Sequence, residues 1–567
     1  MSNAIERKRP LGEIISLLDR GAPITVQNEK KNALVTAVYS TRKAVVSLLL
    51  DRGADVNMVD CDHATALAAA VFRNTTDIVS LLLDRGANVN MVGGEYGTAL
   101  ATAAAAFKEH TSIVSLLLDR GADVNMVGGK YGTALAAAAF RGHTFTVLLL
   151  LDREADVNMV GGKYGTALAA AVFRGHTSTV LLLLDRGADV NMVGGEYGTA
   201  LAAAAFRGHT STVSLLLDRG ADVNMVGGKY GTALATAAYL GHKSTVSLLL
   251  DRGADVNMVG SEYGTALAAA VYSGHTSTVL LLLDRGADVN MVGGEYGTAL
   301  VAAAFREYQS TLSLLLARGA DVNMVGGKYG TALATAAYLG HKSTVSLLLD
   351  RGADVNMVGG YGTALAAAAA AAAFKEHTSI VSLLLDRGAD VNMVGGKYGT
   401  ALAAAAFKEH TSIVSLLLDR GADINMVGVG GKFGTALAAA AFRGHTSTVS
   451  LLLDQGANVS MVAGGKYGTA LATAISKQKS DIVSLLIRHR ADVNLVAGRY
   501  GTVLGQAIYE GNETTTSLLL ERGADIMHVG GSYSIPSGVY PSALDVAHSE
   551  GSRADPTLLM LLTTRNW

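Results

Sequence analysis

The chain has 567 residues, half of them hydrophobic, a net charge of −2 and a single cysteine. The near-neutral charge gives no overall preference for nucleic acid or for a membrane surface. One cysteine cannot form an internal disulfide framework, so we expect an intracellular protein, in the cytoplasm rather than the nucleus. The longest apolar run, Ala364 to Phe374, has eleven residues, well short of the roughly 20 that span a bilayer, and no membrane segment is predicted.

A unit of about 33 residues recurs along nearly the whole sequence. Residues 1–21 are predicted to be an N-terminal half repeat, because only the second half of the unit is recognisable there, from Leu11 to Gly21. Residues 22–530 contain the array, about fifteen full helix-turn-helix units. Residues 531–567 are expected to form a degenerate C-terminal capping repeat, in which SALDVAHSEG and PTLLMLL keep the two helix patterns.

The stretch from Glu196 to Gly228 represents the unit. Apolar residues at i, i+3 and i+4 predict one helix from Thr199 to about Arg207, with Thr199 as its N-cap. A second helix is expected from about Thr210 to Arg219, with Val213, Leu216 and Leu217 on its apolar face. The glycine-rich connector that follows predicts a hairpin-like turn. Because neither helix is long enough to be stable alone in water, each unit must stack on the next.

The second helix of nearly every unit ends at a glycine, which suits a left-handed C-terminal residue. Glu154 and Arg490 stand at two of these positions, and each should cost on the order of 1 kcal/mol locally. Several units depart from the regular length. Ala103 to Ala106 belongs to a unit two residues too long, where we expect a bulge or a shifted first helix. The run Ala366 to Ala373 adds about one helical turn, and Val429-Gly430 is an insertion in a connector.

The sequence GTALAAAAFRGHTSTVSLLLDRGADVN resembles the ankyrin repeat, and the resemblance covers about residues 11 to 562. It implies an all-α ankyrin-repeat α-solenoid with projecting loops and a concave recognition face. Ala134 and Ala136 stand where the family has Pro and His, which removes a usual hydrogen bond of the repeat. The VGGKYGTAL connector resembles long ankyrin tails of fungal signalling proteins, in which an NTPase domain often precedes the array; this sequence has no such domain.

An aromatic residue followed by a basic one ends the first helix of most units. By the resemblance, this position lies on the concave groove, where aromatic anchors and positive charge would bind and steer a partner. A structural interpretation stays open, because a basic residue in the last turn favours the helix dipole and the aromatic ring could only cover the seam between units. The candidate partner-binding residues here are Phe140, Arg141, Phe173, Arg174, Phe206, Arg207, Tyr239, Phe305, Arg306, Phe407, Lys408, Phe442 and Arg443.

The connector residue before tyrosine changes sign from unit to unit, and Lys130, Lys163 and Glu196 are further candidates for partner binding. Variation at one exposed position of a uniform unit is where a repeat protein would encode its partner, although random drift explains it equally well.

No pattern predicts a cofactor, a metal ion or catalytic residues. The GGK sequences lack the Ser or Thr of a phosphate loop. The recurrent histidines, such as His209, are too far apart between units to share a metal ion, and we expect them to pack and hydrogen-bond locally. The repeated DRGAD sequence predicts weak ion pairs on a solvated face.

Several functions remain open. The first is a non-catalytic scaffold that binds protein partners through the concave face and loop tips. The second is the recognition tail of a larger signalling or innate-immunity protein. A third, less favoured, is a binder of nucleic acid or of an acidic polymer, which uses the aromatic and basic residues as a stacking platform.

Overall fold

The structure is a computed structural model that describes residues 1–22, 32–59, 65–106, 108–260, 262–371, 375–428, 434–462, 468–496, 502–527, 533–535 and 538–540. Of residues 375–376 and of the two strands it describes only the backbone. The chain divides into two compact units, unit 1 (Met1–Ala287) and unit 2 (Asp288–Trp567).

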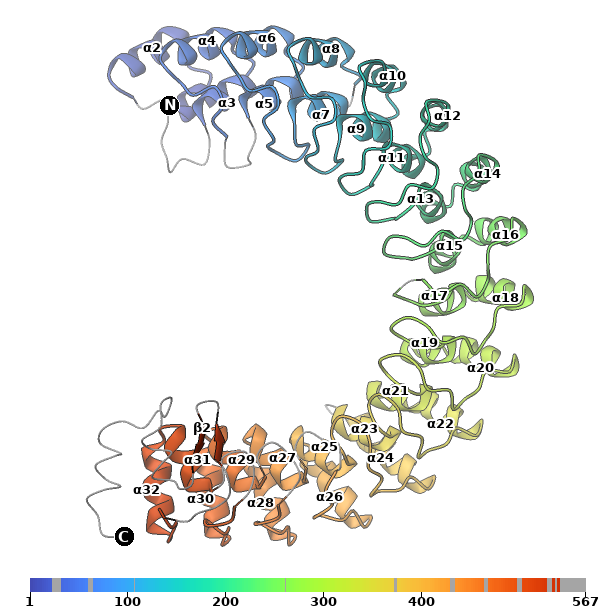
Figure 1. Ribbon diagram of the computed structural model, residues 1–567, viewed down its shortest axis with the longest axis vertical. Helices are drawn as coiled ribbons and strands as arrows, with labels where there is room; N and C mark the ends of the chain where they lie inside the picture. Colours follow the sequence, from blue (N-terminus) through green and yellow to red (C-terminus); the bar gives the residue numbers. More distant parts are fainter. Residues whose placement is uncertain are drawn as a thin grey trace. The chain divides into compact units, whose positions relative to one another are not determined.

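Unit 1 contains paired helices. The helices are α1 (Ser2–Glu6), α2 (Leu11–Asp19), α3 (Ala33–Tyr39), α4 (Lys43–Asp51), α5 (Ala66–Phe72), α6 (Thr76–Asp84), α7 (Ala99–Ala104), α8 (Thr111–Asp119), α9 (Ala134–Arg141), α10 (Thr144–Asp152), α11 (Ala167–Arg174), α12 (Thr177–Asp185), α13 (Ala200–Arg207), α14 (Thr210–Asp218), α15 (Ala233–Leu240), α16 (Lys243–Asp251), α17 (Ala266–Ser273) and α18 (Thr276–Asp284). In each pair from α3 onward the odd-numbered helix is the first helix of a repeat. The even-numbered helices lie together on one side of the unit, and the connectors project beyond the odd-numbered helices on the other side (Figure 1).

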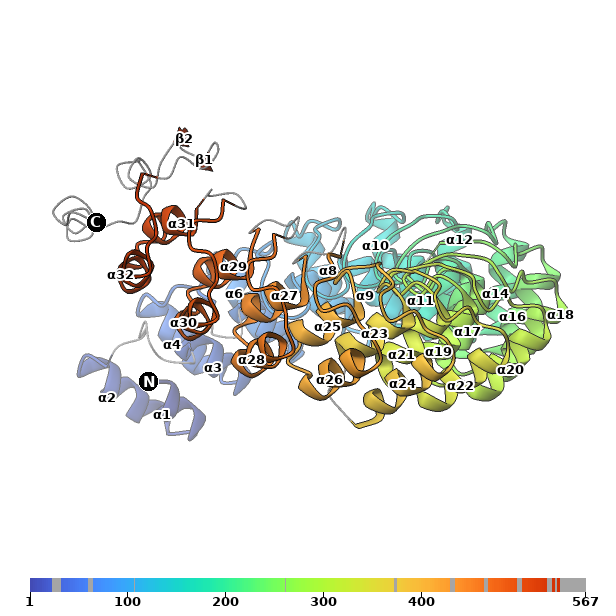
Figure 2. The same cartoon turned by 90° about the horizontal axis from the view of Figure 1, so that it is seen from below.

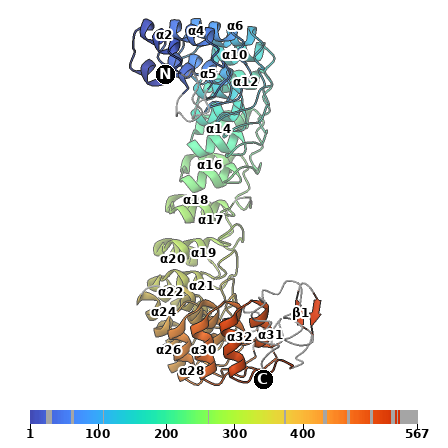
Figure 3. The ribbon, with the colours of Figure 1, turned by 90° about the vertical axis from the view of Figure 1, so that its left-hand side faces the viewer.

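Unit 2 continues the same pattern. Its helices are α19 (Ala299–Arg306), α20 (Gln309–Ala317), α21 (Ala332–Leu339), α22 (Lys342–Asp350), α23 (Ala364–Ala371), α24 (Lys375–Asp386), α25 (Ala401–Phe407), α26 (Thr411–Asp419), α27 (Ala436–Arg443), α28 (Thr446–Asp454), α29 (Ala470–Ser476), α30 (Ser480–Arg488), α31 (Val503–Tyr509) and α32 (Glu513–Glu521). A short antiparallel pair, β1 (Tyr533–Ile535) and β2 (Gly538–Tyr540), follows. The pairs follow in chain order from α19 and α20, and β1 lies beyond α31 (Figures 2 and 3). The pairs from α3/α4 to α31/α32 confirm the predicted all-α solenoid of fifteen units for the described residues.

The first helix of a repeat is buried on every side, whereas the second buries one face. In α13 the Thr199 hydroxyl caps the helix by accepting from the Ala202 amide at 3.1 Å, as predicted, and every residue from Ala200 to Ala205 is buried. Small alanines allow this close packing between first helices. In α14 the buried face is Thr212, Val213 and Leu216, so the prediction was wrong for Leu217, which is only half-buried.

The glycines after the second helices are left-handed, as predicted. Gly220, for example, has φ +84°. Glu154 and Arg490 adopt the same conformation, with φ +66° and +64°. Since a side chain disfavours this region of the backbone, these two positions carry local strain.

The longer repeats place their extra residues in different elements. Helix α7 has six residues, and the surplus Ala105 and Ala106 follow it as buried non-helical residues, so the helix is shortened rather than bulged. Helix α23 has eight residues, and the end of the alanine run, residues 372–373, lies outside the described residues. The next helix, α24, has twelve residues where other second helices have nine. The Val429-Gly430 insertion lies outside the described residues.

The ends of the array differ from their expected form. Residues 1–21 contain α1 as well as α2, and the sequence predicted only the second of these helices. The guanidinium of Arg42 donates to the Arg9 carbonyl at 2.7 Å, which ties the segment after α1 to the next repeat. Of residues 531–567 the structure describes only β1 and β2, so the two predicted helices of the cap lie outside the described residues.

Candidate functional site

The connectors pair with one another through their backbones. Each is a hairpin; in the unit that begins at Glu196 the Gly194 amide donates to the Gly198 carbonyl at 2.7 Å. At the tip, the Glu196 amide donates to the Lys163 carbonyl at 2.8 Å, and the Lys163 amide donates to the Lys130 carbonyl at 2.9 Å. Successive tips from Glu95 to Lys229 in unit 1 are therefore joined as in a β-ladder.

Glycine makes this close approach possible. Gly195 has φ +68°, and a Cβ added to it would lie 2.3 Å from the Gly165 nitrogen, which is backbone and cannot move aside. The paired glycines of the connector are therefore required by packing between repeats.

The tip side chains pair by charge. The Nζ of Lys130 lies 3.3 Å from Glu95, and that of Lys163 lies 3.2 Å from Glu196. The bond to Glu95 raises the pKa of Lys130. Lys130, Lys163 and Glu196 thus form ion pairs in which the charges of neighbouring tips cancel. This pairing explains why the charge at the tip changes sign between repeats, which the sequence alone did not suggest.

The predicted helix-end rings belong to an aromatic ladder, the zigzag of rings in which a connector tyrosine alternates with the ring that ends a first helix. The Phe140 ring lies 4.8 Å from both Tyr131 and Tyr164, and Phe173 lies 4.8 Å from Tyr197. In unit 1 the centroids of successive rings are 4.7–5.6 Å apart along Tyr131, Phe140, Tyr164, Phe173, Tyr197, Phe206, Tyr230, Tyr239, Tyr263 and Tyr272.

Unit 2 repeats this arrangement in shorter stretches. Phe305 lies between Tyr296 and Tyr329, at 5.0 and 5.3 Å. Phe407 lies 5.4 Å from Tyr398 and 6.2 Å from Phe442. The connector tyrosines were not predicted as members of the site, although their 33-residue spacing matches that of the phenylalanines.

The basic residues lie over the rings of the preceding repeat. The guanidinium carbon of Arg174 is 5.0 Å from the Phe140 ring, and that of Arg207 is 5.2 Å from the Phe173 ring. Arg443 lies over Phe407 in the same way, at 5.1 Å. Such contacts are worth roughly 0.5–1 kcal/mol each at an exposed site.

Three basic candidates depart from this pattern. Arg141 is half-buried and donates to the Ala105 carbonyl at 2.7 Å. Arg306 lies over Tyr308 of its own repeat, at 5.7 Å. Lys408 is exposed and forms the C-cap of α25.

The two parts of the aromatic-basic pair have different surroundings. The rings cover the seam between repeats, because each contacts rings of the neighbouring repeat. The guanidinium groups of Arg174 and Arg207 are exposed to solvent. Burial raises the pKa of Tyr197 to about 12, with Glu196 as the next cause, so the ladder stays uncharged and only its basic edge carries charge at neutral pH.

The histidines at the starts of second helices also join repeats. His176 Nε2 lies 3.1 Å from the Phe140 carbonyl, and His242 Nε2 lies 3.1 Å from the Phe206 carbonyl. Burial lowers the pKa of His176, and it lowers that of His410 to about 4, with Lys408 the next cause. The sequence predicted local packing and hydrogen bonding for these histidines, whereas the observed bonds join each ring to a carbonyl of the preceding repeat. Among the described residues, no group of three or more His, Cys, Asp or Glu could hold a metal ion.

The DRGAD residues form the predicted surface ion pairs, and they too link neighbours. Arg219 Nη1 lies 3.1 Å from Asp185, with both side chains exposed, so each pair contributes at most about 1 kcal/mol. Asn191 accepts from the Asp222 amide at 2.7 Å and donates to the Gly220 carbonyl at 3.2 Å.

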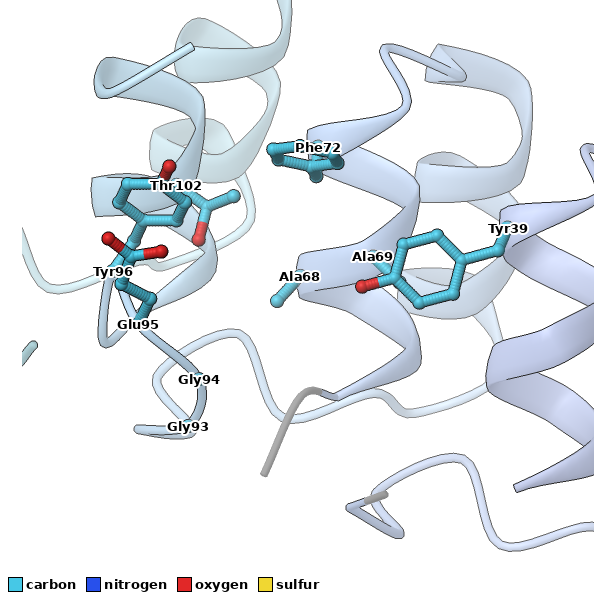
Figure 4. A pocket seen from close by; sticks show the side chains of 9 residues that line it. All are labelled: Tyr39, Ala68, Ala69, Phe72, Gly93, Gly94, Glu95, Tyr96 and Thr102. Carbon is cyan, nitrogen blue, oxygen red and sulfur yellow. The ribbon is translucent and has the colours of Figure 1, made fainter. Parts of the chain in front are cut away.

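A pocket of about 280 Å³ opens where the aromatic ladder begins, and the sequence analysis missed it. The rings of Tyr39, Phe72 and Tyr96, from three successive repeats, line it beside Ala68 and Ala69 (Figure 4). Tyr39 and Phe72 are 41% and 46% exposed, and the Phe72 and Tyr96 centroids are 6.5 Å apart. The rings are therefore less covered here than in the repeats that follow.

These repeated contacts define a class of protein built as a stack of helix pairs, in which each repeat is held by its neighbours. A profile of the ankyrin repeat family, built on three copies of the repeat, matches residues 3–93, 100–194, 170–260, 201–293, 267–359, 359–428 and 437–529. The chain belongs to the ankyrin repeat family. No curated protein sequence matches it. None of the helices in the described part of the chain is long and apolar enough to cross a membrane.

Proposed function

We propose that this protein is a non-catalytic scaffold that binds protein partners along the edge formed by the aromatic ladder, its basic residues and the connector tips. Ankyrin repeat arrays generally bind proteins and typically have no catalytic activity. The observation that carries the proposal is that Arg174 and Arg207 are exposed residues whose guanidinium groups lie over the rings of Phe140 and Phe173.

The rigidity of this edge supports a binding role. The rings are held by neighbours on both sides, and the connector tips are held by backbone hydrogen bonds. Side chains that are fixed before binding lose little conformational entropy when a partner docks. Exposed positive charge beside partly buried aromatic rings also matches the composition of protein-binding hot spots.

Affinity capture from cells that make the protein tests the proposal. The variant Arg174→Glu with Arg207→Glu should lose captured partners, whereas Lys243→Glu with Lys342→Glu should retain them. The control changes the net charge equally and alters exposed residues in the first turns of α16 and α22. Circular dichroism would verify that both variants keep their helix content. Equal capture by the two variants would contradict a binding role for this edge.

A further inference from the structure

We propose that the arginine ridge, defined as Arg174 and Arg207, binds an extended polypeptide segment whose carboxylate side chains lie two residues apart. This inference rests on the proposed scaffold function and specifies the chemistry of the partner.

The first support is the spacing of the ridge. The Phe140 and Phe173 rings are 6.5 Å apart, and the Phe173 and Phe206 rings are 5.9 Å apart. Since Arg174 and Arg207 lie over the first two of these rings at nearly equal distances, their guanidinium groups recur at about the interval of the rings. In an extended chain, side chains on one face recur every two residues, about 6.6–6.8 Å. The two intervals agree within about 1 Å, so an extended segment can place one carboxylate beside each of the two arginines.

The second support is uncompensated charge. Lys163 is paired with Glu196, and Arg219 with Asp185. In contrast, Arg174 and Arg207 have no carboxylate partner in the part of the chain that the structure describes. Neighbouring guanidinium groups repel each other, and each has N–H donors suited to a carboxylate. An anion between successive arginines would remove the repulsion and form charge-assisted hydrogen bonds.

The ring geometry favours an acidic peptide over single-stranded nucleic acid. Nucleobases would need a free ring face for stacking. The Phe140 ring already contacts Tyr131 and Tyr164 at 4.8 Å, and Arg174 lies over it at 5.0 Å. A carboxylate needs only the outer edge of the guanidinium group, which remains exposed.

The length of the ridge sets the length of the ligand. In the next two repeats of unit 1 the residue after the helix-end ring is Leu240 and then Ser273, so the row of charge ends at Arg207. The ridge therefore fits two carboxylates at positions i and i+2 of one strand.

Fluorescence anisotropy with two labelled peptides of equal composition tests the inference on the full chain. One peptide carries Glu-Thr-Glu between Gly-Ser flanks, and the other carries Glu-Glu-Thr, in which no two carboxylates are two residues apart. At low salt we expect the alternating peptide to bind at least about tenfold more tightly, and the preference to vanish in Arg174→Gln with Arg207→Gln but to persist in Lys243→Glu with Lys342→Glu.

Other outcomes overturn the inference. Equal affinities that still depend on Arg174 and Arg207 would exclude the two-residue register, while the scaffold function stands. Absence of binding by either peptide, or tighter binding of a labelled oligothymidylate, would exclude the acidic strand as the ligand. Failure of the scaffold function itself shows separately, as unchanged cellular capture by the Arg174→Glu, Arg207→Glu variant.

Discussion

At the scale of single residues, two glycines with the same backbone conformation have different tasks. Gly187 and Gly195 both have positive φ, +84° and +68°. An added Cβ at Gly187 meets nothing within 4 Å, whereas at Gly195 it would strike the backbone of the preceding connector at 2.3 Å. One glycine therefore ends a helix, and the other allows two repeats to approach.

Replacing each of these two glycines by alanine gives two variants whose stabilities can be compared. Gly187→Ala should cost about 1 kcal/mol, because only the conformational preference is lost. Gly195→Ala should cost at least about 2 kcal/mol, since backbone strain and displacement of a connector add to that preference. Chemical denaturation of both variants measures the difference, and equal stabilities would refute the packing role of Gly195.

Glu154 allows the reverse substitution, in which glycine replaces a residue with a side chain. It has φ +66° at a position where other repeats have glycine, and its side chain is exposed. Glu154→Gly should raise the free energy of unfolding by about 0.5–1 kcal/mol. The chemical denaturation midpoint should move to higher denaturant, and a lower midpoint would show that the side chain has a stabilising contact of its own.

At the scale of elements, the ring that ends a first helix stabilises its contact with the next repeat. Phe173 contacts Tyr164 at 5.0 Å and Tyr197 at 4.8 Å, whereas Phe72, at the open start of the aromatic ladder, is 46% exposed and lies 6.5 Å from Tyr96. Phe173→Ala should therefore cost about 2–3 kcal/mol and Phe72→Ala about 1 kcal/mol or less. Thermal denaturation of the two variants checks this order, which equal losses would contradict.

The histidine that starts a second helix makes stability depend on pH. Because the folded pKa of His410 is about 4 and the ordinary value is about 6.5, the unfolded chain binds the proton more readily between these values. The stability that neutral, folded His410 contributes to the free energy of unfolding is fully present above pH 6.5 and is lost as the pH falls toward 4. With allowance for partial exposure, the loss is on the order of 1–2 kcal/mol.

The measurement compares the native protein with His410→Asn. Between pH 7 and pH 4.5 the native protein should lose more thermal stability than the variant, because the carboxylates that also titrate are common to both. Parallel curves for the two proteins would exclude His410 as a source of the pH dependence.

Sequence reasoning succeeded for local features and failed for contacts between repeats. The Thr199 cap and the glycine ends were predictable, because each depends on a few adjacent residues. The pairing of Lys163 with Glu196 and the alternation of Tyr164 with Phe173 join residues of different repeats or opposite ends of one repeat. Their geometry depends on how closely the repeats stack, which the spacing along the chain does not give.

At the scale of the whole molecule, contacts between neighbouring repeats make whole repeats exchangeable. Residues 229–260 and 328–359 have identical sequences. Deletion of residues 229–327, three 33-residue units, joins Gly228 to Lys328, and every local sequence at the junction already exists in the native chain. We expect the shortened protein to keep its helix content per residue and to unfold with a smaller denaturant dependence, because less surface is exposed. A loss of helix beyond the deleted residues, measured by circular dichroism, would contradict a nearest-neighbour array.

The backbone hydrogen bonds that hold the connector tips determine how the sequence of such a protein can evolve. Tip residues such as Lys130, Lys163 and Glu196 are held in place through their backbone amides and carbonyls, with side chains that are largely exposed. A substitution there alters the chemistry that the protein presents and leaves the hydrogen bonds of the fold intact. Each unit therefore offers one position at which new specificity can arise by point mutation, and duplication of units multiplies those positions.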